Sequence, residues 1–147
     1  MPEPESTALP AALTEHVGYL AVLLGQRAQA DFEAAIEPLG LVPGHYDYLA
    51  TLREHGPTSQ RHLATVLGLD PARVVALTDQ LAERGLVTRE VDPSDRRRNR
   101  ITLTRAGTTL VKQVARIAAQ VEAGLMAGLS RADQAELRRL LRAVTKP

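Results

Sequence analysis

The chain has 147 residues, which is enough for one domain or for one protomer of an intertwined assembly. Its residues are 44% hydrophobic but only 3% aromatic, so we expect a core of leucine, valine, isoleucine and alanine, which suits a helical protein. The absence of cysteine excludes disulfides, thiolate metal sites and thiol redox sensing. The net charge of +1 indicates no class of partner by itself, so the distribution of charge is more informative than its sum.

Residues 1–12 are rich in proline and carry acidic charges at Glu3 and Glu5, so we expect a flexible N-terminus. These features do not fit a signal peptide, which begins with positive charge and continues with an unbroken apolar stretch. No apolar run in the sequence is long enough to span a bilayer. We therefore expect a cytoplasmic protein without a membrane partner.

A long helix is predicted from residue 13 to about residue 36. Its apolar stripe at helical spacing consists of Leu13, Val17, Leu20 and Leu24. Further apolar residues widen this surface beyond one face, which indicates more than one packing partner. The sequence Pro38-Leu39-Gly40 ends the helix.

A shorter helix is predicted from residue 45 to about residue 55, with Tyr48, Leu49 and Leu52 on its inner side. Gly56-Pro57 breaks it. We expect this helix to complete the small hydrophobic core formed with the segment that follows it, residues 58–85.

Residues 58–85 are typical of two short helices joined by a tight turn. Ala64 is small enough for the closest approach of the two helices, and Gly68 can adopt the left-handed backbone that the turn requires. Val74 is a stiff, branched residue suited to packing against the first helix. The helix boundaries agree with this interpretation, because the sequence offers N-caps and a closing glycine at Thr58 or Ser59, at Asp70 followed by Pro71, and at Gly85.

The second of these helices has an outward face that packing does not use. That face comprises Ala72, Arg73, Val75, Ala76, Asp79 and Gln80. Arginine can contact guanine in a major groove, glutamine can contact adenine, and small apolar side chains can contact the methyl group of thymine. The alternative is that these residues are simply solvated.

A basic β-hairpin is predicted after the two helices. Residues 86–91 and 99–104 have strand character, and residues 92–98 between them contain turn residues followed by Arg96, Arg97 and Arg98. Arginines at the tip of a hairpin suit a wing that enters a narrow minor groove, and Asp95 is placed to pair with Arg97 and hold it extended. The alternative is a solvated arginine-rich loop.

Two helices are predicted after the hairpin, from residue 105 to about residue 129 and from residue 131 onward. Thr104 and Ser130 are their expected N-caps. The stripe of the first consists of Leu110, Val114, Ile117, Val121 and Leu125, and that of the second of Leu137, Leu140, Leu141 and Val144. We expect residues 13–40 and 105–147 to form a dimerisation domain, with an intramolecular bundle as the alternative.

Four motifs in the sequence occur together in one known family. They are Ser59–Ala64, Leu81–Arg89, Asp92–Arg97 and Leu103–Gly107. On these motifs the chain resembles the MarR-type (multiple antibiotic resistance regulator) transcriptional regulators from about Leu13 to its C-terminus. The resemblance implies a mostly α fold in which residues 41–104 form a winged helix-turn-helix DNA-binding domain between the dimerisation helices.

The resemblance also implies roles for individual residues at double-stranded DNA. The helix contacts of the family correspond to Arg73, Val75 and Ala76, its backbone contacts to Ser59 and Gln60, and its wing residues to Asp95 and Arg97. Gln80, Arg96 and Arg98 complete the set of DNA-binding residues that we predict. Many members carry a polar or basic residue at the position of Ala76 and serine or threonine at that of Val75, so this chain differs in the bases that it contacts.

Members of the family respond to small ligands, often anionic aromatic compounds, bound between the dimerisation helices and the DNA-binding domain. Such a ligand acts by binding two arrangements of the domains with different affinity. Tyr19, Arg27 and Tyr46 are the residues predicted to line this pocket. The alternative is that the tyrosines are packing residues with a hydrated hydroxyl group.

No catalytic or cofactor motif is found. His16, His45, His55 and His62 do not form a local metal-binding pattern, although some members of the family bind zinc through residues from several helices. There is neither a phosphate-binding glycine-rich loop nor a nucleophile elbow. We therefore predict a homodimeric repressor of a pseudo-palindromic operator, without metal, cofactor or enzymatic activity. The alternatives are a winged-helix module that binds protein instead of DNA, which has no need of so many wing arginines, and an enzyme.

Overall fold

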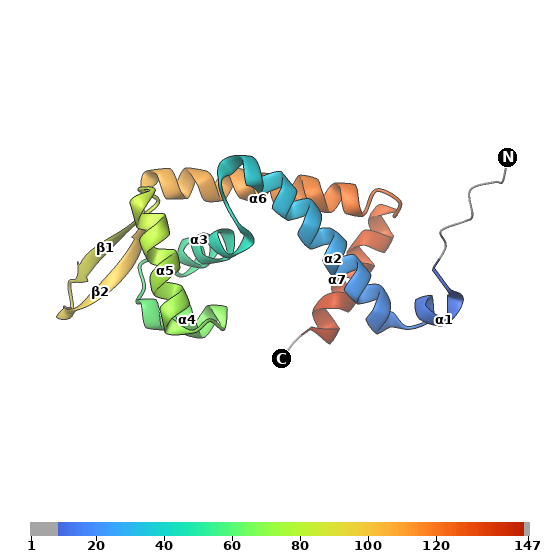
Figure 1. Ribbon diagram of the computed structural model, residues 1–147, viewed down its shortest axis with the longest axis horizontal. Coiled ribbons are helices and arrows are strands. Elements are labelled where there is room, and N and C mark those ends of the chain that lie inside the picture. The colour runs from blue at the N-terminus through green and yellow to red at the C-terminus, as the bar shows by residue number, and fades with distance from the viewer. Residues whose placement is uncertain (1–8, 146–147) are drawn as a thin grey trace.

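The computed structural model describes residues 9–145, with the exception of the side chains of Arg97 and Arg98. It is an elongated arrangement with a compact lobe at one end and a helical arm at the other (Figure 1). The lobe consists of residues 41–104 together with the start of helix α6 (Arg105–Leu125), and the arm contains the first helices, the rest of α6 and the last helix. The long helix α6 runs along both parts.

The fold is mostly α with one small β-hairpin, as the sequence predicted. Its elements are α1 (Ala11–Thr14), α2 (Val17–Ile36), the 3-10 helix η1 (Glu37–Leu39), α3 (Pro43–His55), α4 (Gln60–Leu67), α5 (Pro71–Glu83), β1 (Val87–Asp92), β2 (Asp95–Leu103), α6 (Arg105–Leu125) and α7 (Arg131–Val144). In the range 9–145, no helix is both long and apolar enough to cross a membrane.

Several predicted boundaries were wrong. The first long helix is interrupted, because His16 has an extended backbone between α1 and α2. Ala11 and Ala12, expected to be flexible, belong to α1, while residues 1–8 of that segment lie outside the described residues. The helix expected from residue 45 begins at Pro43, and α6 ends at Leu125 instead of residue 129.

The helix-turn-helix forms as its caps predicted. The Ser59 hydroxyl accepts a hydrogen bond from the backbone N–H of His62, and the Asp70 carboxylate accepts one from the N–H of Arg73. Each such cap contributes about 1 kcal/mol to helix stability. Gly68 ends α4 with φ of 63°, the left-handed conformation that glycine adopts without a steric penalty.

The lobe has one apolar core, to which every element of the lobe contributes. The core consists of Tyr48, Leu49, Leu52, Leu63, Ala64, Val74, Leu77, Leu81, Leu86, Val87, Ile101 and Val111. A second, smaller cluster lies at the junction of lobe and arm, where Ile36 and Leu41 pack against Val114. Because Val111 and Val114 belong to the same helix, α6 is shared by both cores.

A buried polar network crosses the lobe core. Thr78 is fully buried, and its hydroxyl donates to the carbonyl of Val74 at 2.7 Å. It therefore accepts the hydrogen bonds from the Tyr48 hydroxyl at 2.6 Å and from the Gln60 amide at 3.0 Å. Burial raises the pKa of the Tyr48 phenol, which keeps the donor protonated. The network ties α3, α4 and α5 together at a defined angle.

The hairpin is antiparallel, with Val87 opposite Leu103 and Val91 opposite Asn99. Its turn is confined to Pro93 and Ser94. Arg96, Arg97 and Arg98, expected in the loop, belong to β2, but no residue of β1 lies opposite them because Asp92 pairs directly with Asp95. Thr58 and Ile101 exchange two backbone hydrogen bonds and so join the hairpin to the start of the helix-turn-helix.

The start of α6 is packed tightly against the segment before β1. A Cβ atom added to Gly107 would lie 2.1 Å from the carbonyl oxygen of Leu86, a backbone atom that cannot move aside alone. We predict that Gly107→Ala destabilises the protein by about 2 kcal/mol or more in urea unfolding, the usual effect of overpacking a core. Gly124→Ala, in the same helix with nothing within 4 Å, is the control and should be neutral or stabilising. Equal effects of the two substitutions would contradict this packing.

The polar network gives a second stability prediction. Thr78→Val keeps the shape of the side chain but leaves the buried Tyr48 hydroxyl without its acceptor, so unfolding should become easier by about 1–3 kcal/mol. Adding Tyr48→Phe should recover part of that loss, because the two residues act as a pair. Thr65→Val is the control, because the exposed Thr65 hydroxyl bonds only to the carbonyl of Arg61. Additive effects of Thr78→Val and Tyr48→Phe would argue against the network.

Candidate nucleic-acid interface

Helix α5 divides cleanly into a buried and an exposed face. Val74, Leu77, Thr78 and Leu81 are buried in the lobe core. The predicted outward residues Ala72, Arg73, Val75, Ala76, Asp79 and Gln80 are all exposed. The exposed face therefore offers one cation, one carboxylate, small apolar side chains and one amide along a helix that the core holds in place.

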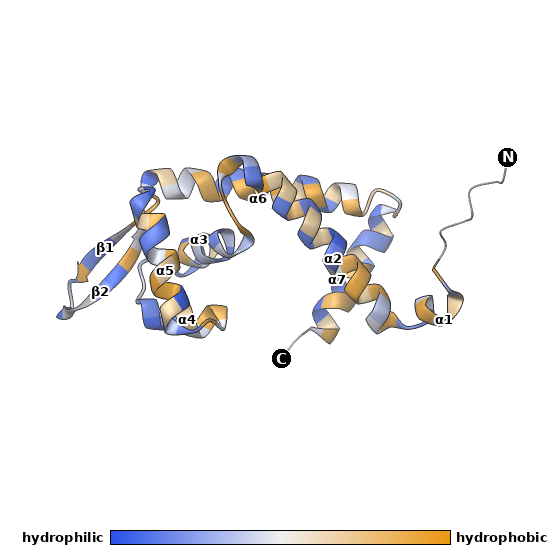
Figure 2. Cartoon of the chain, viewed as in Figure 1, coloured by the Kyte–Doolittle hydropathy of each residue, from blue (hydrophilic) through white to orange (hydrophobic). Residues whose placement is uncertain are grey.

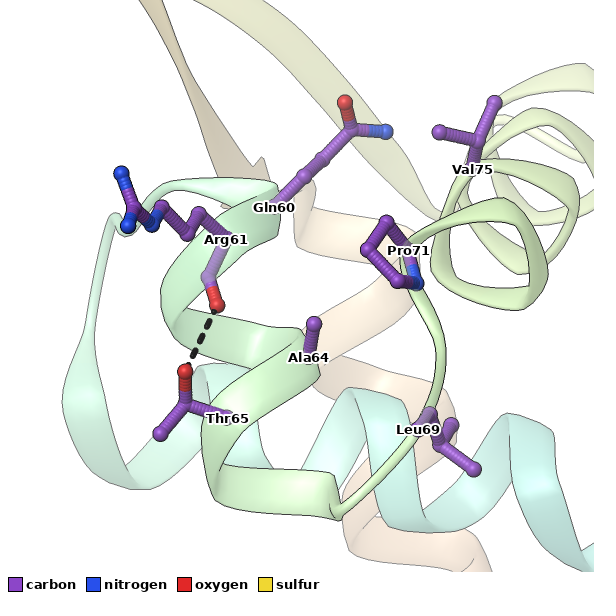
Figure 3. A pocket seen from close by; sticks show the side chains of 7 residues that line it. All are labelled: Gln60, Arg61, Ala64, Thr65, Leu69, Pro71 and Val75. Atoms are coloured by element: carbon purple, nitrogen blue, oxygen red, sulfur yellow. Dashed lines mark hydrogen bonds between the residues drawn. The ribbon is translucent and has the colours of Figure 1, made fainter.

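A shallow hollow of about 590 Å³ lies between α4 and α5 on this exposed side. Figure 3 shows Gln60 extending from α4 toward Val75 of α5, with Pro71 and Ala64 between the two helices, while Arg61 extends to the other side of α4. The hollow is lined mainly by apolar atoms, and Arg61 is exposed at its edge. Sequence reasoning did not select Arg61, although it directly follows the predicted contact residues Ser59 and Gln60.

Two of the predicted DNA-binding amides already have partners in the lobe. The Gln60 amide donates to Thr78 and is half-buried. The Gln80 oxygen lies 2.9 Å from Nε2 of His45. Since Nδ1 of His45 accepts from the N–H of Val42, Nε2 carries the proton and donates to Gln80. Only the amide nitrogen of Gln80 is left for a partner outside the chain, and Ser59 likewise serves as a helix cap.

The wing arginines differ in their surroundings. Arg96 is exposed near the irregular tip of the hairpin, and Asp95 beside it is half-buried. The predicted pairing of Asp95 with Arg97 cannot be followed here, because the side chains of Arg97 and Arg98 lie outside the described residues. At the turn, hydrogen bonds from the hydroxyl and the N–H of Ser94 lower the pKa of the Asp92 carboxyl and hold the turn closed.

Three further arginines near the hairpin have structural partners. Arg84 donates to the carbonyls of Leu39 and Gly40 at 2.8 and 2.7 Å, which ties the end of α5 to the end of the arm helix. Arg89 pairs with Asp79 of α5, and Arg100 lies 3.7 Å from Glu90 on the facing strand. These three arginines are therefore engaged in contacts within the chain.

A second cavity of about 410 Å³, the junction cavity, lies where the arm meets the lobe. It is lined by Ala28, Gln29, Phe32, Tyr46, Asp47, Ala118, Val121, Glu122 and Leu125. Tyr46, one of the three residues predicted to line a ligand pocket, lines this cavity. Tyr19 and Arg27 are not among the lining residues, and the exposed Arg27 lies 3.7 Å from Asp31 one turn later. No sequence motif marks this cavity, because its walls come from α2, α3 and α6.

Comparisons with known proteins agree with this geometry. The model of the MarR family matches residues 41–98, which include α3, α4, α5 and β1. The chain is 32% identical over 133 residues to the HTH-type transcriptional repressor NicR of Pseudomonas putida, covering 90% of this chain and 84% of that protein.

Solved structures extend the similarity over the whole fold. CouR bound to a 23-mer DNA duplex superposes with a TM-score of 0.83 at 29% identity, covering 96% of this chain and all of that one (100%). CouR from Rhodococcus jostii RHA1 bound to p-coumaroyl-CoA gives 0.77 at 31% identity, with coverage of 94% and 97%.

BpsR of Bordetella bronchiseptica, whose DNA binding is regulated by 6-hydroxynicotinic acid, gives a TM-score of 0.78 at 29% identity, covering 95% of this chain and 99% of that one. The relatives are regulators and not enzymes, and they match the lobe and the arm together. This chain belongs to the MarR family of transcriptional regulators.

Proposed function

We propose that this protein is a homodimeric repressor that binds a pseudo-palindromic operator and is released from it by a small aromatic ligand. The main observation behind the proposal is the exposed face of α5. Arg73, Val75 and Ala76 are accessible to solvent on this face, while the opposite face of the helix is buried in the core. A helix held in this way fits a major groove, and Val75 and Ala76 suit the methyl groups of thymines.

Phosphate contacts complete the proposed interface. Ser59 and Gln60 lie at the exposed start of α4, where backbone N–H groups favour an anion. Arg97 enters the minor groove with Asp95 orienting it, while Arg96 and Arg98 lie along the backbone. Gln80 contributes its amide nitrogen. The DNA complex of CouR supports this assignment, because that protein has the same fold over the full chain.

The exposed apolar surface of the arm supports the proposal of a dimer. Apolar side chains stay uncovered in the single chain, and Val17 of α2 and Val144 of α7 are 80% and 78% exposed. Figure 2 shows apolar residues on α1, α2 and α7, at the end of the arm remote from the wing. A second copy related by two-fold symmetry would bury these faces and present two α5 helices to two half-sites about one helical turn apart.

The competing function is a winged-helix module that binds protein. The wing tip argues against it, since consecutive arginines suit a phosphate backbone better than a mixed protein surface. The test is a titration of the intact protein against the DNA upstream of its own gene and against random duplex, at two salt concentrations. Tight, salt-sensitive binding with preference for one palindromic segment supports the proposal. No binding at low salt would reject it in favour of a protein partner.

The proposed contact of the wing with DNA can be tested by substitution. Arg97→Ala should weaken operator binding and reduce the slope of log affinity against log salt by about one unit, because one phosphate-like contact is lost. Arg139→Ala is the control, since Arg139 lies on α7 and bonds to Glu136 of the same helix. The wing assignment fails if Arg97→Ala leaves both affinity and slope unchanged.

The dimer interface can be tested separately. Leu140 of α7 is 47% exposed and belongs to the apolar stripe of that helix. Leu140→Glu would place a charge in the interface and should weaken dimerisation by about 100-fold or more, measured by sedimentation equilibrium. Ala135→Glu, on the opposite face of α7, should leave the mass unchanged. A monomeric wild-type protein, or an unchanged Leu140→Glu dimer, would contradict this interface.

A further inference from the structure

The junction cavity has an acidic lining. Asp47 of α3 and Glu122 of α6 contribute carboxylates, and none of its lining residues is basic. Glu122 is already compensated, because Arg138 of α7 donates to it at 2.6 Å. The carboxylate of Asp47, in contrast, has no hydrogen bond or ion pair with any part of the chain that the structure describes.

Asp47 lines the cavity while remaining exposed to solvent on its open side. The neighbouring protein removes water from one side of the carboxylate, and burial raises its pKa. A carboxylate that is hydrated on one side only and has no partner attracts a cation that enters from the cavity. Asp47 is therefore a place where a positively charged group binds favourably and where a negatively charged group is repelled.

The remaining walls favour an organic cation over a simple ion. Phe32 and Tyr46 line the cavity with ring centroids 5.7 Å apart and an interplanar angle of 59°. Aromatic faces attract ammonium groups through the negative charge of the ring face, and they also cover apolar groups. The amide nitrogen of Gln29 donates to Glu33 at 2.8 Å, which leaves the amide oxygen as an acceptor.

We propose that the junction cavity binds a small organic cation, with an ammonium group directed at Asp47 and an aromatic or alkyl body against Phe32 and Tyr46. The inference rests on the proposed function, and it assigns the ligand that releases DNA to this cavity. It gives the ligand a charge opposite to that of p-coumaroyl-CoA and 6-hydroxynicotinic acid, the anions named for CouR and BpsR. An anion would need a basic residue in the lining, and the arginines nearby are held by Asp31 and Glu122.

Two probes of equal shape and opposite charge test the inference. The intact protein is titrated with 4-phenylbutylamine and with 4-phenylbutyrate, by calorimetry and by NMR of the methyl groups of Ala28, Val121 and Leu125. The amine should bind at this site about tenfold or more tightly than the carboxylate, as expected for a charge-assisted contact. Asp47→Asn should reduce the affinity for the amine about tenfold. Glu54→Gln, which removes an exposed carboxylate of the same helix outside the cavity, is the control and should have little effect.

Three results would overturn the inference: equal or tighter binding of the carboxylate, unchanged binding of the amine to Asp47→Asn, or no binding of either probe. Operator binding is measured on the same samples. If the protein binds DNA but shows no preference for the amine, only the proposed charge of the ligand is rejected. If the protein shows the preference but binds no DNA, the proposed function is rejected instead.

Discussion

The close contact between Gly107 and the carbonyl of Leu86 fixes the start of α6, and the rest of the structure depends on it. Thr104 reinforces this contact, because its hydroxyl donates to the carbonyl of Gly85 and accepts from the N–H of Gly107. From this point α6 runs through the lobe core at Val111 and into the junction cluster at Val114. One helix thus sets the direction of the arm relative to the wing and to α5.

Two side chains make further links between the same parts. Arg84 at the end of α5 bonds to the carbonyls of Leu39 and Gly40, and His45 connects the backbone of Val42 with Gln80 on the exposed side of α5. Both links pass from the segment between arm and lobe directly to the helix that is proposed to enter the groove. The junction cavity is lined by Tyr46 and Asp47, which directly follow His45 in α3, so we propose that a ligand there shifts the position of α5 through these packed connections.

The sequence predicted local features well and distant contacts poorly. The caps at Ser59, Asp70 and Thr104 were predictable because each depends on residues three positions apart in the chain. The interruption at His16 was not, since no glycine or proline marks it. The role of Arg84 was missed because its partners lie 44 and 45 residues away. Among the lining residues of the junction cavity only Tyr46 was predicted, because three separate helices supply its walls.

The central claim is that the exposed faces of the arm hold two DNA-binding lobes on one operator. The most direct test is the mass of the complex with a duplex that contains one operator, measured by light scattering during gel filtration at saturating protein. The account predicts two chains per duplex, protecting two half-sites about one helical turn apart in a footprinting experiment. A saturated complex with one chain, or a single protected half-site, would contradict it.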